Sequence, residues 1–449
     1  MSGQTAPRAT GSPEDGADLS TNEKILRDCH QLYTAPERGL ITIGKHLGEK
    51  LQAQNRKITV MVMGNHSAGK SSFINWYIGE SVQRTGVAIE TQAFSFITSG
   101  RKRESLTGKS TLHLYPQFKD LEEISGLTDH LSTEICPSRQ RDFNLVTFID
   151  TPGLVDGEMT YQFDVDEALV RIGEKVDLIY VFFEPMGQAL CKRTLSVVEK
   201  LNHKHAERLR FYLSKADTAG NECDRQRVLI QVTQQLCSKP GLNQCGFDMQ
   251  TIYIPDLSQL SSCVNQIEET CKTITKSVNQ AVQTALEQLE SDCELLLQRT
   301  NQRLLKDREL VQRSRRGWMR RRLFGCLAYL VPISWLAAAI VPLLATQTIS
   351  LATGERLAEA AQLHARRLAA AWAWLSGDSP LLAVAIVVVF SFIATFLSQS
   401  DSAMKRPLSR KETKTLERNR DHVRDVVKVK KNALCEQFLR QSVTDEDWC

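Results

Sequence analysis

The residues best placed to do chemistry in this chain form one glycine-bounded run. They are Gly64, Asn65, His66, Ser67, Ala68, Gly69, Lys70, Ser71 and Ser72, which follow the pattern G-x-x-x-x-G-K-S. The glycines of such a run let the backbone turn so that successive N–H groups point at phosphate oxygens. The lysine then contacts the β- and γ-phosphates, and the serine hydroxyl binds Mg²⁺. The run therefore predicts a binding site for a nucleoside triphosphate and Mg²⁺.

Two later motifs follow in the order that such a site needs. Asp150 opens the run Asp-Thr-Pro-Gly, which ends at Gly153, and Ser214 opens the run Ser-Lys-Ala-Asp, which ends at Asp217. We expect Asp150 to hold the magnesium shell and the N–H group of Gly153 to meet the γ-phosphate. The second run resembles the N/T-K-x-D element of GTPases, in which the aspartate binds the guanine edge and the lysine stem, here Lys215, covers the ring. Asp217 alone would serve equally well as a helix N-cap.

Each motif follows a short apolar run that reads as a buried strand. These runs cover 58–63, 145–149 and 209–213, and a fourth lies at 176–183. Apolar strands that alternate with helical patterns predict a parallel sheet with helices on both faces. Ligands bind such sheets at the carboxyl ends of the strands, where all three motifs fall. The predicted fold class is α/β, a P-loop NTPase with a mostly parallel sheet.

Several of these segments resemble one family. The run from Gly64 to Ser72 resembles the P-loop of the dynamin superfamily, and residues 90–97 are similar to the switch I segment of dynamins and of their EHD relatives. Residues 150–155 and 176–179 also resemble the EHD pattern. The resemblance covers residues 57–257 and implies a dynamin-type G domain, a GTPase that uses Mg²⁺ and dimerises across its nucleotide face.

The resemblance also implies roles for single residues. Catalysis would rest on Ser67, Lys70 and Thr91, where Thr91 closes on the metal and both Ser67 and Thr91 place the attacking water. The metal ligands would be Ser71, Thr91 and Asp150. Leu154 stands where Ras-like proteins have their water-positioning glutamine, so ordering by a dimer partner would have to replace it.

Composition narrows the class of protein. The 449 residues carry a formal net charge of +4, which does not indicate a nucleic-acid-binding protein. The 12 cysteines show no metal-binding spacing, and we expect them to be reduced thiols in the cytosol. Residues 1–21 are rich in Ser, Gly, Pro and Thr and are expected to be disordered.

Two stretches near the carboxyl end lack charge. They cover residues 323–354 and 381–400, and each is long enough for a membrane-crossing helix of roughly 20 apolar residues. Basic residues precede the first stretch at 313–322 and follow the second at 405–411, so both flanks are predicted to be cytosolic. We expect a transmembrane hairpin over 323–400. The first stretch contains Pro332 and Pro342, so a re-entrant segment is the alternative.

The remaining segments read as helices. A G domain with an N-terminal helix is predicted over 22–257, a helical connector with a basic end over 258–322, and a charged cytosolic tail over 401–449. An apolar stripe runs along the connector from Val264 to Ala285, which predicts either packing within the molecule or an intermolecular coiled coil. The tail would fold back onto the connector or lie on the membrane as an amphipathic helix.

Together these features predict a membrane-anchored, dynamin-like GTPase. It would form a nucleotide-dependent homodimer or oligomer and tether, fuse or remodel lipid bilayers of the endoplasmic reticulum or the mitochondrial outer membrane. Its architecture is similar to that of atlastins and mitofusins. The alternative is a membrane-fixed nucleotide switch or scaffold with little hydrolysis. ATP is also a candidate substrate, because EHD proteins resemble GTPases in this motif but hydrolyse ATP.

Overall fold

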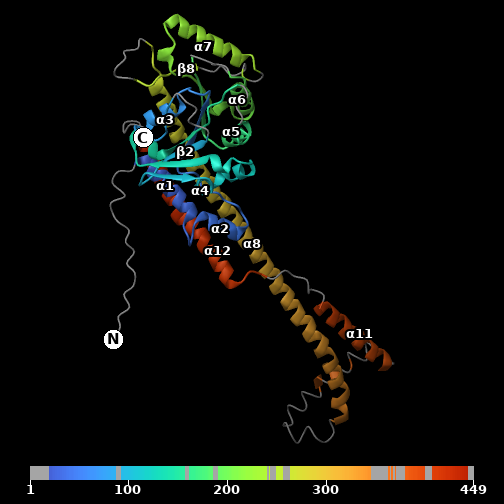
Figure 1. Cartoon of the computed structure of the whole chain (residues 1–449). Coiled ribbons are helices and arrows are strands. Elements are labelled where there is room, and N and C mark those ends of the chain that lie inside the picture. The colour runs from blue at the N-terminus through green and yellow to red at the C-terminus, as the bar shows by residue number, and fades with distance from the viewer. Residues whose placement is uncertain are drawn as a thin grey trace, which may run out of the picture. The chain divides into compact units, whose positions relative to one another are not determined.

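The structure is a computed structural model (Figure 1), and it divides the chain into two compact units. The first unit comprises residues 1–294 and 423–449, and the second comprises residues 295–422. The structure describes residues 20–86, 93–156, 161–185, 191–239, 242, 249–255, 263–344, 363–364, 366–367, 370, 380–399 and 407–442. The predicted disordered segment 1–21 therefore lies almost entirely outside the described residues.

The first unit is built on a sheet that has eight strands in the described residues. In chain order they are β1 (Ile58–Gly64), β2 (Phe94–Ser99), β3 (Glu104–Thr107), β4 (Leu131–Cys136), β5 (Val146–Asp150), β6 (Leu178–Phe183), β7 (Leu209–Leu213) and β8 (Met249–Thr251). Their order across the sheet is β3-β4-β2-β5-β1-β6-β7-β8. The pairs β2–β5 and β3–β4 are antiparallel, and the other neighbours are parallel. The sheet is thus mostly parallel, as predicted.

Helices connect the strands. They are α3 (Lys70–Ile78), α4 (Lys109–Leu114), α5 (Val165–Gly173), α6 (Lys192–His205) and α7 (Glu222–Cys237). Short 3₁₀ segments also occur, namely η2 (Pro116–Glu123), η3 (Thr128–His130), η4 (Gln140–Leu145), η5 (Ala206–Arg208) and η6 (Ala216–Thr218).

Alternation along β6 explains why helices cover both faces of the sheet. Successive side chains of a strand point to opposite faces. On one face, Tyr180 and Phe182 meet the ring of Phe73 from α3, with centroids 6.3 and 5.4 Å from it. On the other face, Val181 belongs to a core that includes Leu169 of α5. Buried aromatic rings of this size dominate the packing energy of a core. These contacts therefore hold α3, which begins directly after the glycine-bounded turn, against the sheet.

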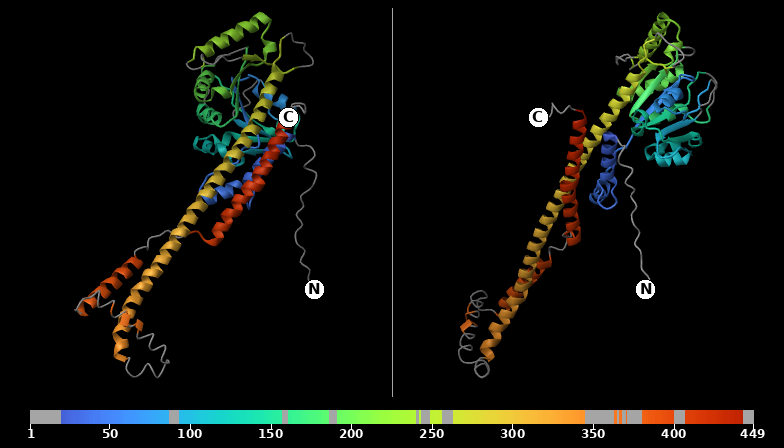
Figure 2. Two further views of the ribbon diagram at one scale, coloured as in Figure 1. Left: turned by 180° about the vertical axis from the view of Figure 1, so that it is seen from behind. Right: turned by 90° about the vertical axis from the view of Figure 1, so that its left-hand side faces the viewer.

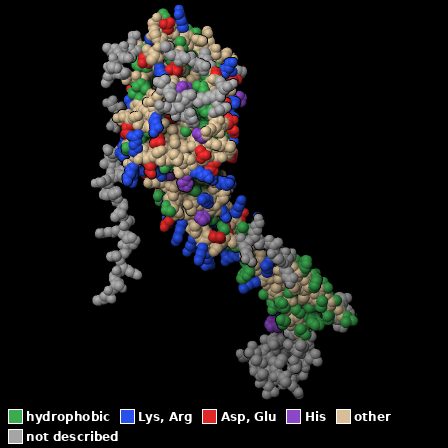
Figure 3. All heavy atoms as spheres, viewed as in Figure 1, with side chains coloured by type: hydrophobic (Ala, Val, Ile, Leu, Met, Phe, Trp, Pro, Cys, Tyr) green, Lys and Arg blue, Asp and Glu red, His purple; other side chains and the backbone are tan. Residues whose placement is uncertain are grey.

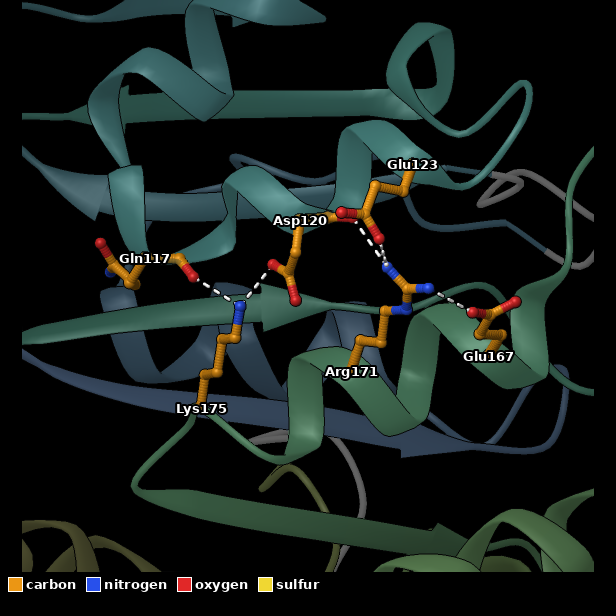
Figure 4. A network of polar contacts seen from close by, with 6 residues as sticks. All are labelled: Gln117, Asp120, Glu123, Glu167, Arg171 and Lys175. Carbon is orange, nitrogen blue, oxygen red and sulfur yellow. Dashed lines mark hydrogen bonds and ion pairs between the residues drawn. The ribbon is translucent and has the colours of Figure 1, made fainter.

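A polar network joins α5 to the η2 segment (Figure 4). Arg171 Nη1 contacts Glu123 at 2.9 Å, and Arg171 Nη2 contacts Glu167 at 2.6 Å. Lys175 Nζ donates to the Gln117 carbonyl at 2.7 Å and also pairs with Asp120. Since several of these groups are exposed to solvent, the ion pairs add little to stability, and the network mainly fixes the position of η2 against α5.

The N-terminal segment forms two helices of the first unit, α1 (Thr21–Thr34) and α2 (Leu40–Leu47). The N-terminal helix predicted from residue 22 onward ends at Thr34, where Ala35 precedes a proline and takes an extended conformation. Tyr33 of α1 donates to Asp292 of α8 (Ile267–Leu344) at 2.6 Å. The N-terminal helices therefore pack on the first part of α8.

The end of the chain completes this bundle. After a π-helical turn, η7 (Val423–Val427), the helix α13 (Lys428–Ser442) runs beside α1 and the first part of α8 (Figure 2). Lys431 pairs with Glu290 of α8 at 2.7 Å, and Lys430 pairs with Asp28 of α1 at 3.4 Å. Of the two alternatives for the tail, folding back onto the connector describes this segment.

The apolar stripe predicted from Val264 begins later than expected. Val264 lies before α8 and is 74% exposed, so its place in the stripe was wrong. Ile267, Ile274 and Val278 are buried, and burial continues to Leu289 on the same face of α8. Within the first unit this face packs inside the molecule.

The second unit contains the rest of α8, α11 (Pro380–Gln399) and α12 (Arg410–His422). Asp307 of α8 accepts a hydrogen bond from the Leu408 backbone, 2.7 Å away. Much of the predicted hairpin, including residues 345–362 and 371–379, lies outside the described residues. Among the helices that are described, none combines the length and the apolar character needed to cross a bilayer.

Candidate nucleotide site

The glycine-bounded turn follows β1 directly and leads into α3. Gly64 has φ +148°, and a Cβ there would lie 2.2 Å from the carbonyl oxygen of Phe182 on the neighbouring strand. Gly69 has φ +76° and occupies the N-cap position of α3. A side chain is disfavoured at such positive φ angles. Gly64 is therefore required by close packing as well as by its backbone conformation, and Gly69 by its conformation.

A cavity of about 280 Å³ lies over this turn. Its lining residues are His66, Ser67, Ala68, Gly69, Lys70, Ser71, Ser72, Arg84, Thr85, Gly86, Gly153, Glu184 and Lys215. The cavity lies at the carboxyl ends of β1 and β6 and at the N-terminus of α3. Helix N-termini favour anions, and parallel sheets bind ligands at this edge. The surroundings suit a phosphate chain.

Lys70 is the buried cation of this cavity. It is 6% exposed, and its Nζ donates to the carbonyl oxygen of Asn65 at 3.0 Å and, more weakly, to that of Gly64 at 3.5 Å. Burial lowers the pKa of Lys70 to about 8, against the opposing effect of the negative charge of Asp150. A phosphate beside Lys70 would supply the strong counter-charge that two neutral carbonyl groups lack.

Asp150 lies beneath the cavity at the end of β5 and reaches it through Ser71. Its Oδ2 accepts a hydrogen bond from Ser71 Oγ at 2.5 Å, and its Oδ1 has no partner among the described residues. Complete burial raises the pKa of Asp150, whereas the positive charge of Lys70 opposes the rise. A buried carboxylate oxygen without a partner is costly, and carboxylates and hydroxyls are ligands that Mg²⁺ prefers. Ser71 and Asp150 therefore fit a magnesium shell.

The segment after Asp150 is joined to the turn by its backbone. The N–H group of Leu154 donates to the Gly64 carbonyl at 3.1 Å, and the N–H group of His66 donates to the Leu154 carbonyl at 3.0 Å. At Gly153 the chain passes so close that an added Cβ would lie 2.7 Å from His66 Cα. Only a residue without a side chain therefore fits at this position, and Gly153 forms part of the cavity wall.

Several positioning residues of this segment were not predicted. Tyr161 donates to the Gly153 carbonyl at 2.6 Å, and the Arg193 guanidinium lies 4.9 Å from the centre of the Tyr161 ring. Asp156 accepts hydrogen bonds from the backbone N–H groups of Lys192 at 2.8 Å and Arg193 at 3.2 Å, so it caps α6 in place of a local cap residue. These contacts tie the segment after Gly153 to the start of α6. The sequence signal was weak, because the two N–H groups that Asp156 binds lie 36 and 37 residues away in the chain.

The turn is anchored to its neighbours by two further side chains. Thr194 of α6 donates to the Asn65 side chain at 2.7 Å, and both groups are buried. Ser214 donates to the Ala68 carbonyl at 2.7 Å, although Asn or Thr is usual at this position. Serine therefore keeps the contact between the base-recognition segment and the phosphate turn.

The two base-recognition residues are placed differently. Lys215 has φ +51°, lines the cavity and pairs with Glu184 at 2.8 Å. Asp217 lies in η6 with an exposed side chain and does not line the cavity. The structure therefore brings Lys215 to the phosphate turn, whereas the role of Asp217, predicted to bind the base and not a phosphate, stays a prediction.

Most of the predicted site residues meet at one place. The turn from Gly64 to Ser72, Asp150, Gly153 and Lys215 all lie at or directly beneath the cavity. Thr91, predicted as the third metal ligand, lies outside the described residues, and Thr85 and Gly86 are the last described residues before it. The catalytic and metal-binding roles of these residues stay predictions.

The sequence of this chain is similar to that of dynamin-related proteins. Residues 60–216 match the family model described as Dynamin family. EH domain-containing protein 1 of Arabidopsis thaliana is 27% identical over 176 residues, which are 37% of this chain and 31% of that protein. EH domain-containing protein 2 of Rattus norvegicus is 26% identical over 169 residues, which are 36% of this chain and 30% of that protein. The chain thus spans about a third of the length of these curated relatives.

Solved structures include one of an oligomerised bacterial dynamin pair, described as a mechanism for the long-range sensing and tethering of membranes. It is 11% identical, covers 94% of this chain and 74% of that chain, and has a TM-score of 0.42. The family assignment rests on the sequence matches, which coincide with the strands and the phosphate turn described above. Residues 60–216 therefore match the Dynamin family model, and this part of the chain is similar to part of the EH domain-containing proteins.

Proposed function

We propose that this protein is a membrane-associated, dynamin-like GTPase that uses Mg²⁺. One observation carries the proposal. Among the described residues, a buried lysine without an ion-paired carboxylate and a buried carboxylate with an unpartnered oxygen meet at one glycine-bounded turn, at the ligand-binding edge of the sheet. Each of these groups is costly in an empty site and is stabilised by a triphosphate and its metal.

The chain's own residues supply positioning and charge. Phosphoryl transfer depends mainly on holding the phosphates in line and stabilising the charge that they develop. Lys70 and the N–H groups of the turn from Ser67 to Ser71 would hold the β- and γ-phosphates. Mg²⁺, held by Ser71 and the shell around Asp150, would neutralise phosphate charge when bound.

The attacking water needs a positioning group other than a glutamine. Leu154 follows Gly153, and it is fully buried with its backbone N–H and C=O both used in the bridge to the turn. Ser67 lines the cavity and is available for this role, and Thr91 is the second candidate by family resemblance. We propose that dimerisation through the G domain orders these groups, as the resemblance to dynamins implies.

The second unit supplies the evidence for a membrane partner. Large apolar side chains are exposed on α8 beyond residue 323 and on α11, where Figure 3 shows hydrophobic side chains gathered. The most exposed are Tyr329, Leu330, Leu381, Val388, Phe392 and Phe396. Apolar patches of this kind mark membrane or protein contacts. The adjacent basic run 313–322 would add about 1 kcal/mol per side chain near an anionic lipid surface.

We therefore propose that α8 and α11 enter or line a bilayer, with both ends of the chain on the cytosolic side. The endoplasmic reticulum and the mitochondrial outer membrane both suit this topology. Membrane tethering, fusion or remodelling is the proposed use of GTP hydrolysis.

The test is hydrolysis by the full chain as a function of protein concentration, with and without vesicles. Turnover per molecule that rises with concentration, together with nucleotide-dependent self-association, is the expected result for a dynamin-like enzyme. Slow turnover that is independent of concentration would instead indicate the nucleotide switch or scaffold. Thr91→Ala measured in single turnover is the control, because it should slow hydrolysis while nucleotide binding persists.

A further inference from the structure

A second cavity lies at the edge of the sheet opposite to the nucleotide site. Its volume is about 860 Å³. It opens where β1 begins and β2 ends, whereas the phosphate turn follows the other end of β1. His30 of α1 and Gln52 after α2 contribute to its wall. The cavity therefore lies between the sheet of the G domain and the N-terminal helices, all within the first unit.

We propose that this cavity binds a phosphorylated, multiply charged small anion, either a soluble phosphate ester or the phosphorylated headgroup of a lipid. The proposal does not depend on nucleotide hydrolysis. It rests on three features of the lining, namely a lysine held without a counter-ion, a group of hydroxyls beside it, and a rim with an excess of positive charge.

Lys57 is the lysine held without a counter-ion. Its Nζ donates to Thr98 Oγ1 at 2.8 Å, to the Ser99 carbonyl at 2.8 Å and to Ser99 Oγ at 2.7 Å. All three partners are neutral, and no carboxylate of the described residues lies within ion-pairing distance. Burial lowers the pKa of Lys57 to about 8, and the charge of Glu23 opposes this only in part. Three neutral acceptors orient the ammonium group and leave its charge uncompensated.

Hydroxyl groups lie close to Lys57 at the same wall. Thr98 and Thr147 are buried neighbours whose oxygens lie 3.2 Å apart, and both line the cavity. The Tyr115 hydroxyl oxygen is buried beside the hydroxyls of Thr98 and Thr147, and it makes no well-formed hydrogen bond among the described residues. A buried hydroxyl without a partner is costly, and it can donate to an anion. These groups offer donors where a phosphate oxygen near Lys57 would lie.

The rim carries the remaining charge. Arg56, Arg101 and Lys102 line the cavity with exposed side chains, and Glu104 is the one carboxylate among its lining residues. Opposite charge around a concave site raises the local concentration of an anion and increases its association rate. Arginine also forms paired hydrogen bonds with phosphate. A ligand with several phosphate groups would use both the wall and the rim.

Occupancy of this cavity would link two parts of the first unit. His30 belongs to α1, which packs on α8 and α13, whereas Thr98 and Thr147 belong to the sheet. An anion bound between them would favour the arrangement in which the N-terminal helices stay docked on the G domain. The cavity would then sense a phosphorylated metabolite or lipid separately from the nucleotide.

The experiment titrates the full chain with myo-inositol hexakisphosphate, with inorganic phosphate, and with vesicles that contain a phosphoinositide. Two variants test the site, Lys57→Met at the wall and Arg56→Gln/Lys102→Gln at the exposed rim. The rim variant should fold normally, because both side chains are exposed. The matched control is Arg227→Gln/Lys276→Gln, which removes the same charge from exposed positions outside the cavity.

We expect each site variant to weaken inositol hexakisphosphate binding by about tenfold or more, since charge-assisted hydrogen bonds of this kind contribute roughly 1.5–3 kcal/mol. The control variant and Lys70→Ala should bind as the wild type does. Vesicle binding that falls in the site variants but not in the control variant, without binding of the soluble probes, would assign the site to a lipid headgroup. Binding of the soluble probes alone would assign it to a soluble ester. Loss of binding in Lys70→Ala but not in the site variants would overturn the proposal, because the anion would then occupy the nucleotide site. Absence of binding, or equal loss in the control variant, would also overturn it.

Discussion

Replacing Gly153 by alanine tests whether the segment after Asp150 is held against the phosphate turn as described. The added methyl group would lie 2.7 Å from His66 Cα and 3.1 Å from His66 N, and both are backbone atoms that cannot rotate away. The clash would separate the two segments and break the hydrogen bonds between His66 and Leu154 and between Leu154 and Gly64. Overpacking costs about 1–3 kcal/mol and each hydrogen bond about 0.5–1.5 kcal/mol, so we expect a loss of about 2–6 kcal/mol.

The assay is chemical unfolding of the full chain combined with hydrogen exchange of residues 64–67 and 152–156. The control is Gly325→Ala, because Gly325 lies in α8 and a Cβ there would meet nothing within 4 Å. Alanine is the better helix former, so the control should unfold no earlier than the wild type. Wild-type stability and wild-type exchange in Gly153→Ala would refute the close approach and the bridge built on it.

Three further perturbations test the surroundings of the site. Phe73→Ala should lower the free energy of unfolding in urea by about 3–5 kcal/mol, because the Phe73 side chain is 1% exposed and packs among four aromatic rings of the core. A loss below about 1 kcal/mol would contradict this packing. Tyr161→Phe removes the hydroxyl that donates to the Gly153 carbonyl. Amide hydrogen exchange of residues 152–156 should become faster, and the rate of GTP hydrolysis should fall while GTP affinity stays unchanged. An equal fall in GTP affinity would contradict a positioning role. Burial lowers the pKa of Lys70 from 10.5 to about 8. Between these two pH values the unfolded chain therefore binds more protons than the folded chain. As a result, the contribution of Lys70 to the free energy of unfolding rises with pH in that window. Lys70→Met should flatten the rise between pH 8 and pH 10 in urea unfolding, and an unchanged rise would show that other groups cause it.

The arrangement of the candidate site was predictable because its residues depend on local chain geometry. Gly64 and Gly69 sit in a turn whose φ angles exclude most side chains, and Lys70 opens the next helix, so spacing along the chain fixes them. Asp150 ends an apolar strand that pairs with β1, and this pairing brings it next to Ser71. The parallel pairing of two strands that their apolar runs predict therefore places Asp150 beside Ser71.

Contacts between distant segments were not predictable in the same way. Asp156 caps a helix that begins at Lys192, and a capping residue is recognised in sequence only when it immediately precedes its helix. Lys57 is not distinguished in sequence from any lysine that precedes a strand, because its partners Thr98 and Ser99 reach it only through the sheet. The antiparallel pairing of β2 with β5 places them there, and pairing direction is not encoded in the apolar run of β2.

The position of Asp217 shows the same limit. The pattern Ser-Lys-Ala-Asp places Lys215 at the cavity, but the left-handed backbone at Lys215 turns the following residues into η6, away from the phosphate turn. The sequence pattern describes residue order and not the direction of this turn. Asp217 does not cap α7, whose N-cap is Asn221, so helix capping was wrong and base recognition is the interpretation that a nucleotide-specificity measurement tests.

The most direct test of the central proposal is a titration of the full chain with fluorescent GTP and ATP analogues in the presence of Mg²⁺. Wild-type protein should bind the GTP analogue more tightly than the ATP analogue, and chelation of Mg²⁺ should weaken binding. Lys70→Ala should weaken it by about tenfold to a hundredfold, since it removes a charge-assisted contact to phosphate. Failure of folded wild-type protein to bind either nucleotide, or undiminished binding by Lys70→Ala, would contradict the nucleotide site and the function built on it.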